Sequence, residues 1–238
     1  MEVSKKFYTW FYNRIHSNYY DLMVKCLMLP FGGESKWREK MLEPISFSKK
    51  EKILDMCCGT GGATLFISRK AITGSVITGI DLSSGQLKHA KKRNYLCDVK
   101  FIERDATKTS LPDNYFDKVF ITHAIHEMKR EIRLRTLQES YRVLKENGQL
   151  SVLELDNPDN ILLKIFIFIW FLYWLPFNFE TPTRRDMLRH GVVNEVKEAG
   201  FVNIRKYSIY NGVCQTVTGE KTLLKVEEIH DEDLKNGY

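Results

Sequence analysis

The stretch ILDMCCGTGG, residues 53–62, places a carboxylate, two cysteines and several glycines directly after an apolar run. Such a loop can bind nucleotide phosphates, form a metal or redox cysteine site, or hold another cofactor. Thr64 stands where the dinucleotide fingerprint has its third glycine, and no Gly-Lys-Ser/Thr follows, so both phosphate loops are disfavoured. Cys57 and Cys58 are adjacent, so their side chains point apart and are expected to pack within the loop. The third kind of site is therefore favoured.

Three carboxylates, Asp55, Asp81 and Asp105, lie at the ends of three successive β-like runs. A carboxylate beside the glycine turn would repel a pyrophosphate but suits a cationic ligand, such as S-adenosylmethionine with its ammonium and sulfonium. Asp81, 20 residues after Gly61, can accept both ribose hydroxyls. Asp105 can accept the adenine amine, while Ala106 leaves room for the ring. Singly, the loop can be a plain tight turn and Asp81 a helix cap, but together they predict a site for S-adenosylmethionine.

His123 and His126 follow the fourth predicted strand, next to where the transferred methyl group should lie. Histidine titrates near neutral pH, so either residue is a candidate general base that converts a phenol to its phenolate. Glu127 is a candidate to orient one of the two rings. The alternative for each histidine is an ordinary packed or solvent-facing residue.

Strands and helices are expected to alternate from Lys52 onward. The predicted strands are 52–56, 75–82, 99–106, 116–124 and 149–156, and the predicted helices are 62–71, 83–96, 129–148 and 183–200. Ser83 or Ser84 is expected to cap the second helix, and Gly148 to close the third. Asn211-Gly212 predicts a final hairpin within 201–221. This order predicts an α/β, Rossmann-like open sheet, mainly parallel, with an antiparallel C-terminal hairpin and helices on both faces.

The chain of 238 residues, 43% of them hydrophobic, is long enough for one well-filled domain. We expect a helical cap over 1–50, broken at Pro30 and Gly32-Gly33, a main domain over 51–226 and an acidic tail over 227–238. The net charge of +6 is not gathered into a dense basic block, so no nucleic-acid partner is predicted. Five cysteines without a C-x-x-C pair, and an N-terminus without a signal-peptide core, predict a cytoplasmic protein with reduced thiols and no metal site.

From about Phe7 to Gly200 the chain resembles the class I S-adenosylmethionine-dependent methyltransferases, and within them the ubiquinone/menaquinone C-methyltransferases. The stretches that carry the resemblance are ILDMCCGTGG, GIDLSSGQLKHAKKR, ERDATKTSLPDNYFDKVFITHAIHEM, LQESYRVLKENGQLSVLELDNP, NYYDLM and SKWREKM. The resemblance implies cofactor contacts at Thr60, Asp81, Asp105 with Ala106, and Thr122, and a site-closing tyrosine at Tyr20. The full set of predicted cofactor contacts is Tyr20, Asp55, Cys57, Gly59, Thr60, Gly61, Asp81, Leu82, Asp105, Ala106 and Thr122.

The chain departs from this family after the fourth predicted strand. The quinone enzymes usually show a phenylalanine-glycine-leucine-arginine-asparagine pattern there, whereas this chain has HAIHEM, residues 123–128. The wall that faces the substrate has therefore changed.

An apolar segment, ILLKIFIFIWFLYWLPF at residues 161–177, carries a single charge, Lys164. It is shorter than the roughly 20 residues of a membrane span and apolar all round. Within an insert at 161–179, it is predicted to form a lid that dips into a bilayer and admits a lipophilic acceptor. The alternatives are a helix buried under the cap, or a dimer contact, so the chain is expected to be a monomer or a homodimer.

The leading hypothesis is a methyltransferase on the inner face of a membrane that methylates a lipophilic small molecule, first a carbon of a prenylated quinol. S-Adenosylhomocysteine would be its product. A second hypothesis is N- or O-methylation of a phospholipid head group or other small molecule. A noncatalytic protein that binds the cofactor at a membrane or in a partner complex is the alternative of another class.

Overall fold

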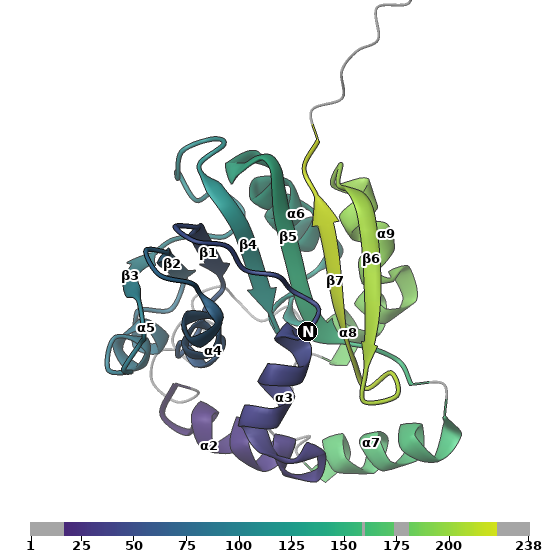
Figure 1. Cartoon of the computed structure of the whole chain (residues 1–238). Helices are drawn as coiled ribbons and strands as arrows, with labels where there is room; N and C mark the ends of the chain where they lie inside the picture. Colours follow the sequence, from purple (N-terminus) through teal and green to yellow (C-terminus); the bar gives the residue numbers. More distant parts are fainter. Residues whose placement is uncertain (1–16, 159, 174–180, 223–238) are drawn as a thin grey trace, which may run out of the picture.

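The computed structural model describes residues 17–158, 160–173 and 181–222. Seven strands form one sheet in the order β3-β2-β1-β4-β5-β7-β6 (Figure 1). The strands are β1 (Lys52–Met56), β2 (Val76–Asp81), β3 (Asp98–Glu103), β4 (Phe116–Thr122), β5 (Leu144–Leu155), β6 (Val202–Ile209) and β7 (Cys214–Glu220). β1 to β5 pair in parallel, and β7 pairs antiparallel with both β5 and β6. The predicted fold is confirmed.

Helices cover both faces of the sheet and one of its ends. They are α2 (Ser17–Met28), α3 (Gly33–Leu42), α4 (Gly62–Lys70), α5 (Ser84–Ala90), α6 (Arg130–Val143), α7 (Ile161–Tyr173), α8 (Thr181–His190) and α9 (Val192–Glu198), with short 3-10 turns η2 (Leu29–Phe31) and η3 (Ile125–Glu127). α2 and α3 are separated at Pro30 and Gly32, as the sequence predicts.

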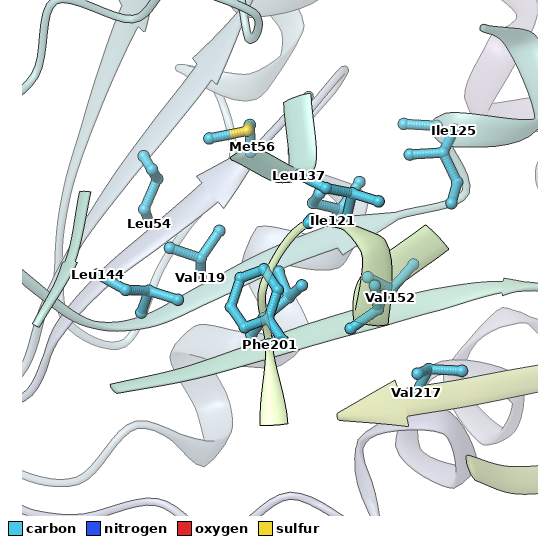
Figure 2. Packing of buried hydrophobic residues seen from close by; sticks show 14 of the residues in the cluster. Leu54, Met56, Val119, Ile121, Ile125, Leu137, Leu144, Val152, Phe201 and Val217 are labelled. Atoms are coloured by element: carbon cyan, nitrogen blue, oxygen red, sulfur yellow. The ribbon is translucent and has the colours of Figure 1, made fainter. Parts of the chain in front are cut away.

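Alternate residues of the central strands serve two separate cores. On β1, Leu54 and Met56 pack with α6, α8 and α9, whereas Ile53 packs with α3 and α4. This alternation follows from the two-residue period of a strand. Figure 2 shows the first core, in which side chains of β1, β4, β5, β7 and α6 pack against one another.

Local signals identify two of the connections correctly. The Ser83 hydroxyl caps α5 by accepting the Gln86 backbone N–H at 3.2 Å. The hairpin turns at Asn211 and Gly212, which both have positive φ. A side chain at position 212 would also approach the Pro158 backbone to 2.8 Å, so this turn requires glycine.

Three predicted helices have the wrong extent. The helix predicted over 83–96 ends at Ala90, where the Tyr95 hydroxyl donates to the Ala90 carbonyl at 2.8 Å. The helix predicted over 129–148 ends at Val143, not at Gly148, because the backbone N–H groups of Asn114 and Tyr115 bind the carbonyls of Arg142 and Val143. Leu144 then begins β5 by pairing with Phe116.

The helix predicted over 183–200 is two helices. Gly191 lies between α8 and α9 with φ 81° and ψ 129°, a conformation that no α-helix contains.

The parallel strands deliver their carboxyl ends to the edge where α2, α3 and α7 gather (Figure 1). On α7, Leu163 and Ile167 are one turn apart and pack against the core under the cap helices. Its other described apolar side chains are exposed, namely Ile161, Leu162, Ile165, Phe166, Phe168 and Ile169. Within the described ranges, no helix combines the length and apolar character needed to cross a membrane.

Candidate active site

The glycine loop leaves β1 at the carboxyl edge and wraps around the end of β2. Asp81 accepts the Gly59 backbone N–H at 2.9 Å through Oδ2 and the Ser83 backbone N–H at 2.8 Å through Oδ1. Burial raises the pKa of Asp81, and these N–H donors oppose that effect. Among the described residues, a side chain added at Gly59 would meet only Gln86 Oε1, at 3.8 Å, so this part of the chain leaves space above the glycine. The loop therefore presents backbone and a carboxylate to a close-fitting ligand.

Asp55 lies beneath this loop with no exposed surface. Its Oδ2 accepts the Thr64 hydroxyl at 2.5 Å, while Oδ1 has no hydrogen-bond partner among the described residues. Burial raises the pKa of Asp55 to about 7, although the Thr64 hydrogen bond and the charge of Arg38 lower it. A buried acceptor without a donor gains most from a nearby cation. Asp55 therefore fits the electrostatics expected of a site for a cationic cofactor.

The cap is attached to the glycine loop by three side chains. Asp21 of α2 accepts the Thr60 hydroxyl at 2.6 Å and the Arg93 guanidinium at 2.6 Å. Arg93 also donates from Nε to the Thr60 carbonyl at 2.6 Å. The buried Thr60 side chain is thus turned toward the cap, and these contacts, named here the cap latch, fix where α2 lies over the loop.

Three further predicted contacts lie at or just after the carboxyl ends of β3 and β4. The carboxylate of Asp105 accepts the backbone N–H and the hydroxyl of Thr107, at 2.9 and 2.7 Å. Ala106 is partly buried against the first core. Thr122 ends β4, and its buried hydroxyl has no hydrogen-bond partner within the described ranges. This hydroxyl can therefore donate a hydrogen bond to a ligand bound at the end of β4.

His123 and His126 meet at one buried carboxylate, that of Glu154. Nδ1 of His126 lies 2.8 Å from Oε1 of Glu154, and Nδ1 of His123 lies 3.7 Å from the same oxygen. Trp37 of α3 donates from Nε1 to Nε2 of His123 at 3.1 Å. Burial lowers the pKa of His123, even though Glu154 raises it. The pair lies at the carboxyl edge, immediately after β4.

The remaining predicted residues occupy different settings. Leu82 is 39% exposed beside Asp81. Cys57 has a φ of 61°, and burial raises the pKa of Cys57 and Cys58 well above the usual thiol value, so both remain thiols that pack in the loop. Tyr20 lies on α2, but its side chain is outside the described part of the chain.

Four residues at this edge were missed by sequence reasoning: Glu154, Trp37, Asp21 and Arg93. The carboxylate of Glu154 lies beside both imidazole rings. A weak signal was present in the sequence, since Glu154 is a single charged residue near the end of the mostly apolar run LSVLEL, on the strand beside β4. Among the described residues, no group of three or more histidine, cysteine, aspartate or glutamate side chains is placed to hold a metal ion.

Comparison with known proteins gives matches over most of the chain. Residues 2–181 match the ubiE/COQ5 methyltransferase family. An uncharacterized methyltransferase of Synechocystis sp. is 28% identical over 89% of this chain and 94% of its own length. A demethylmenaquinone methyltransferase of Thermotoga maritima is 37% identical over 66% of each chain. The crystal structure of a SAM-dependent methyltransferase from Aquifex aeolicus has a TM-score of 0.59 at 19% identity, covering 78% of this chain and 89% of that one.

Proposed function

Because the chain belongs to the ubiE/COQ5 methyltransferase family, we propose that this S-adenosylmethionine-dependent enzyme methylates a ring carbon of a prenylated quinol. Relatives named demethylmenaquinone methyltransferase support an acceptor of this class. The observation that carries the lipophilic acceptor is α7, because it exposes six apolar side chains at the edge of the sheet where the site lies.

The chain's own groups fit the cofactor. In this proposal Asp81 accepts the ribose hydroxyls, Asp105 accepts the adenine amine, and the open face above Gly59 admits the methionyl part. Asp55 acts through its charge beneath the loop. When bound, S-adenosylmethionine supplies an electrophilic methyl group and leaves as S-adenosylhomocysteine. The protein's task is then to position the acceptor and exclude water.

The acceptor must also lose a proton. A quinol carbon becomes a good nucleophile when the neighbouring hydroxyl is deprotonated, and a neutral histidine is suited to take that proton. His123 and His126 lie directly after β4 and share Glu154, so the proposal gives this pair the proton transfer.

The exposed face of α7 is proposed to rest on a lipid bilayer. Leu22 and Leu29 add exposed apolar side chains on α2 and the turn after it, at the same end of the molecule. Lys25 and Lys36 are exposed on the cap helices, and the chain carries a net charge of +6. Apolar side chains beside lysines fit a membrane that contains anionic lipid. The acceptor would enter between this face and the cap.

A single experiment tests this function. The purified protein is incubated with methyl-labelled S-adenosylmethionine and either reduced demethylmenaquinol or a total lipid extract. Label on the quinol ring supports the proposal. Label on a phospholipid head group would instead support the second candidate, for which the altered segment His123–Met128 is the favouring feature. Binding without turnover to S-adenosylhomocysteine on any acceptor would support a noncatalytic role.

A further inference from the structure

Arg38 of α3 is a buried cation at the start of α4, with 6% of its surface exposed. Its Nε donates to Oε1 of Glu34 at 2.9 Å, one turn earlier on the same helix. That contact uses one of the five N–H donors of the guanidinium. Among the described residues, Nη1 and Nη2 of Arg38 have no hydrogen-bond partner. A buried donor without an acceptor costs free energy, which an anionic ligand would recover.

The guanidinium of Arg38 lies over the first residue of α4. A side chain at Gly62 would bring its Cβ to 2.9 Å from Nη2 of Arg38 and 3.3 Å from Oε1 of Glu34, so glycine leaves room for this pair. The N-cap residue is Gly61, which has no side chain that could bind the first N–H groups of the helix. These N–H groups and the helix dipole attract anions. Arg38 and the start of α4 therefore present N–H donors side by side at the glycine loop.

Arg38 is held in position because α3 is docked on both sides of it. The preceding residue, Trp37, is buried and donates from Nε1 to Nε2 of His123 at 3.1 Å. Three residues after Arg38, the Met41 carbonyl accepts the hydroxyl of Thr216 on β7 at 2.7 Å. These contacts fix the backbone from which the guanidinium extends, and Glu34 fixes its orientation. A group that is already in position loses little conformational entropy when a ligand binds.

Asp55 supplies the opposite charge at the same turn of α4. Its Oδ2 accepts the hydroxyl of Thr64, the third residue of that helix, at 2.5 Å. Burial raises the pKa of Asp55, and the Thr64 hydrogen bond and the charge of Arg38 lower it. No ion pair joins Asp55 to Arg38 within the described ranges, so neither charge neutralises the other. A ligand that carries both an ammonium and a carboxylate would interact favourably with both side chains.

We propose that Nη1 and Nη2 of Arg38 bind the α-carboxylate of S-adenosylmethionine. The inference deepens the proposed function and rests on it, because it requires the methionyl part of the cofactor to lie over the glycine loop. A carboxylate held by the two Nη groups makes two parallel hydrogen bonds. Asp55 acts on the ammonium of the same ligand through its charge. The carboxylate does not change during methyl transfer, so Arg38 binds S-adenosylmethionine and S-adenosylhomocysteine alike.

Calorimetry with two ligands tests this assignment without an acceptor. The first ligand is S-adenosylhomocysteine, and the second is the same molecule without its carboxyl group. Arg38→Met should weaken binding of the first ligand about tenfold to a hundredfold, because hydrogen bonds between charged groups are strong. It should not weaken binding of the second, which has no group for Arg38 to bind. Lys36→Met removes an exposed cation from the same helix and is the matched control, which should bind both ligands as the wild type does.

Gly62→Ala provides an independent variant that keeps Arg38 and decides the question if Arg38→Met does not fold. Its added methyl group should displace Nη2, so it should weaken binding of S-adenosylhomocysteine more than binding of the ligand without the carboxyl group. Equal losses for the two ligands, or unchanged affinity for S-adenosylhomocysteine in folded Arg38→Met, would overturn the inference alone. A wild type that binds neither ligand would refute the proposed function together with the inference.

Methyl transfer to reduced demethylmenaquinol gives a second readout. Arg38→Met should raise the KM for S-adenosylmethionine and leave kcat within about threefold of the wild type, because an interaction made equally in the ground state and the transition state changes KM alone. A lower kcat at unchanged KM would place Arg38 with the acceptor and overturn the assignment. A wild type that binds the cofactor but does not methylate the quinol would refute the proposed acceptor, and calorimetry would then decide the role of Arg38.

Discussion

Asp81 connects the glycine loop to the end of β2, since its two oxygens accept the backbone N–H groups of Gly59 and Ser83. Each carboxylate oxygen has a second lone pair, so the side chain can accept ribose hydroxyls without losing these contacts. Asp55, one strand away, is fully buried and lacks this access. Substitution of Asp81 is therefore expected to change cofactor affinity, whereas substitution of Asp55 is expected to change the pH dependence of stability.

Asp81→Asn should weaken S-adenosylmethionine binding about tenfold to a hundredfold, because hydrogen bonds to a charged group contribute about 1.5–3 kcal/mol. Isothermal calorimetry measures the change. Asp98→Asn, an exposed residue at the opposite end of the neighbouring strand, is the matched control and should bind normally. An Asp81→Asn protein that is folded and binds the cofactor normally would remove Asp81 from the site.

Asp55 should make the ligand-free protein less stable as the pH rises. Its pKa is about 7 in the fold, against 3.8 for an ordinary exposed aspartate, so the native state binds more protons between these values. Stability therefore falls with rising pH across this window, by up to about 4 kcal/mol. Asp55→Asn cannot titrate, so the Tm of the wild type relative to the variant should decline from about pH 5 to about pH 8. A constant difference would mean that Asp55 is ionised throughout.

At the scale of elements, the cap latch joins α2 to the loop between β1 and α4. Asp21 is 41% exposed in its side chain, so the ion pair with Arg93 adds little to global stability, roughly 0–1 kcal/mol. Its role is therefore to fix the position of α2. Val24 and Met28 of α2 also pack into the second core, so loss of the latch is expected to loosen α2 without unfolding the sheet.

Asp21→Ala should speed hydrogen exchange in α2 while leaving β1 and β4 protected, and should raise the dissociation rate of S-adenosylmethionine. Hydrogen exchange measured by mass spectrometry without the cofactor reports the opening of α2, and the same measurement with the cofactor reports its closure over the glycine loop. Glu43→Ala, which breaks the exposed pair with Lys40 next to α3, is the control for loss of a surface ion pair. Equal exchange in the two variants would show that the latch does not hold the cap.

At the scale of the whole molecule, the carboxyl edge of the parallel strands, the cap and α7 lie at one end (Figure 1). The opposite edge carries the amino ends of the parallel strands. With this arrangement, α7 can rest on a bilayer while the carboxyl edge of the sheet stays close to the membrane surface, from which a lipophilic acceptor would enter. Burying one such apolar side chain contributes about 1.5–3 kcal/mol, so several together would hold the protein at a membrane.

Ile165→Asp combined with Phe168→Asp should release the protein from vesicles that contain phosphatidylglycerol, with cofactor affinity unchanged. Both residues are exposed, at 49% and 63%, so the fold should tolerate the change. Flotation measures attachment. Leu96→Asp, at an equally apolar position exposed to 74% just before β3, is the control that should still float. A wild type that does not float would end the membrane proposal, and a dimer that the double variant dissociates would make this face a subunit contact.

The sequence by itself determined the alternation of strands and helices, the glycine loop, a serine cap at the start of α5 and the hairpin at Asn211-Gly212. These features depend on periodicity and turn chemistry within a few residues, which pattern alone reveals. The family followed from the same stretches. Helix ends were less predictable, because partners distant in sequence decided them. The carbonyls of Arg142 and Val143 bind N–H groups that lie 28 residues earlier in the chain.

Only the tertiary structure decided which groups lie together at the candidate site. Glu154 reaches His126 across 28 residues, and Trp37 reaches His123 across 86, because β5 lies beside β4 and α3 packs over their ends. The cap latch and the outward face of α7 arise in the same way. Such contacts depend on strand order and on helix docking, which no local pattern encodes. For that reason the sequence indicated two candidate bases but not Glu154, the carboxylate that lies beside both of them.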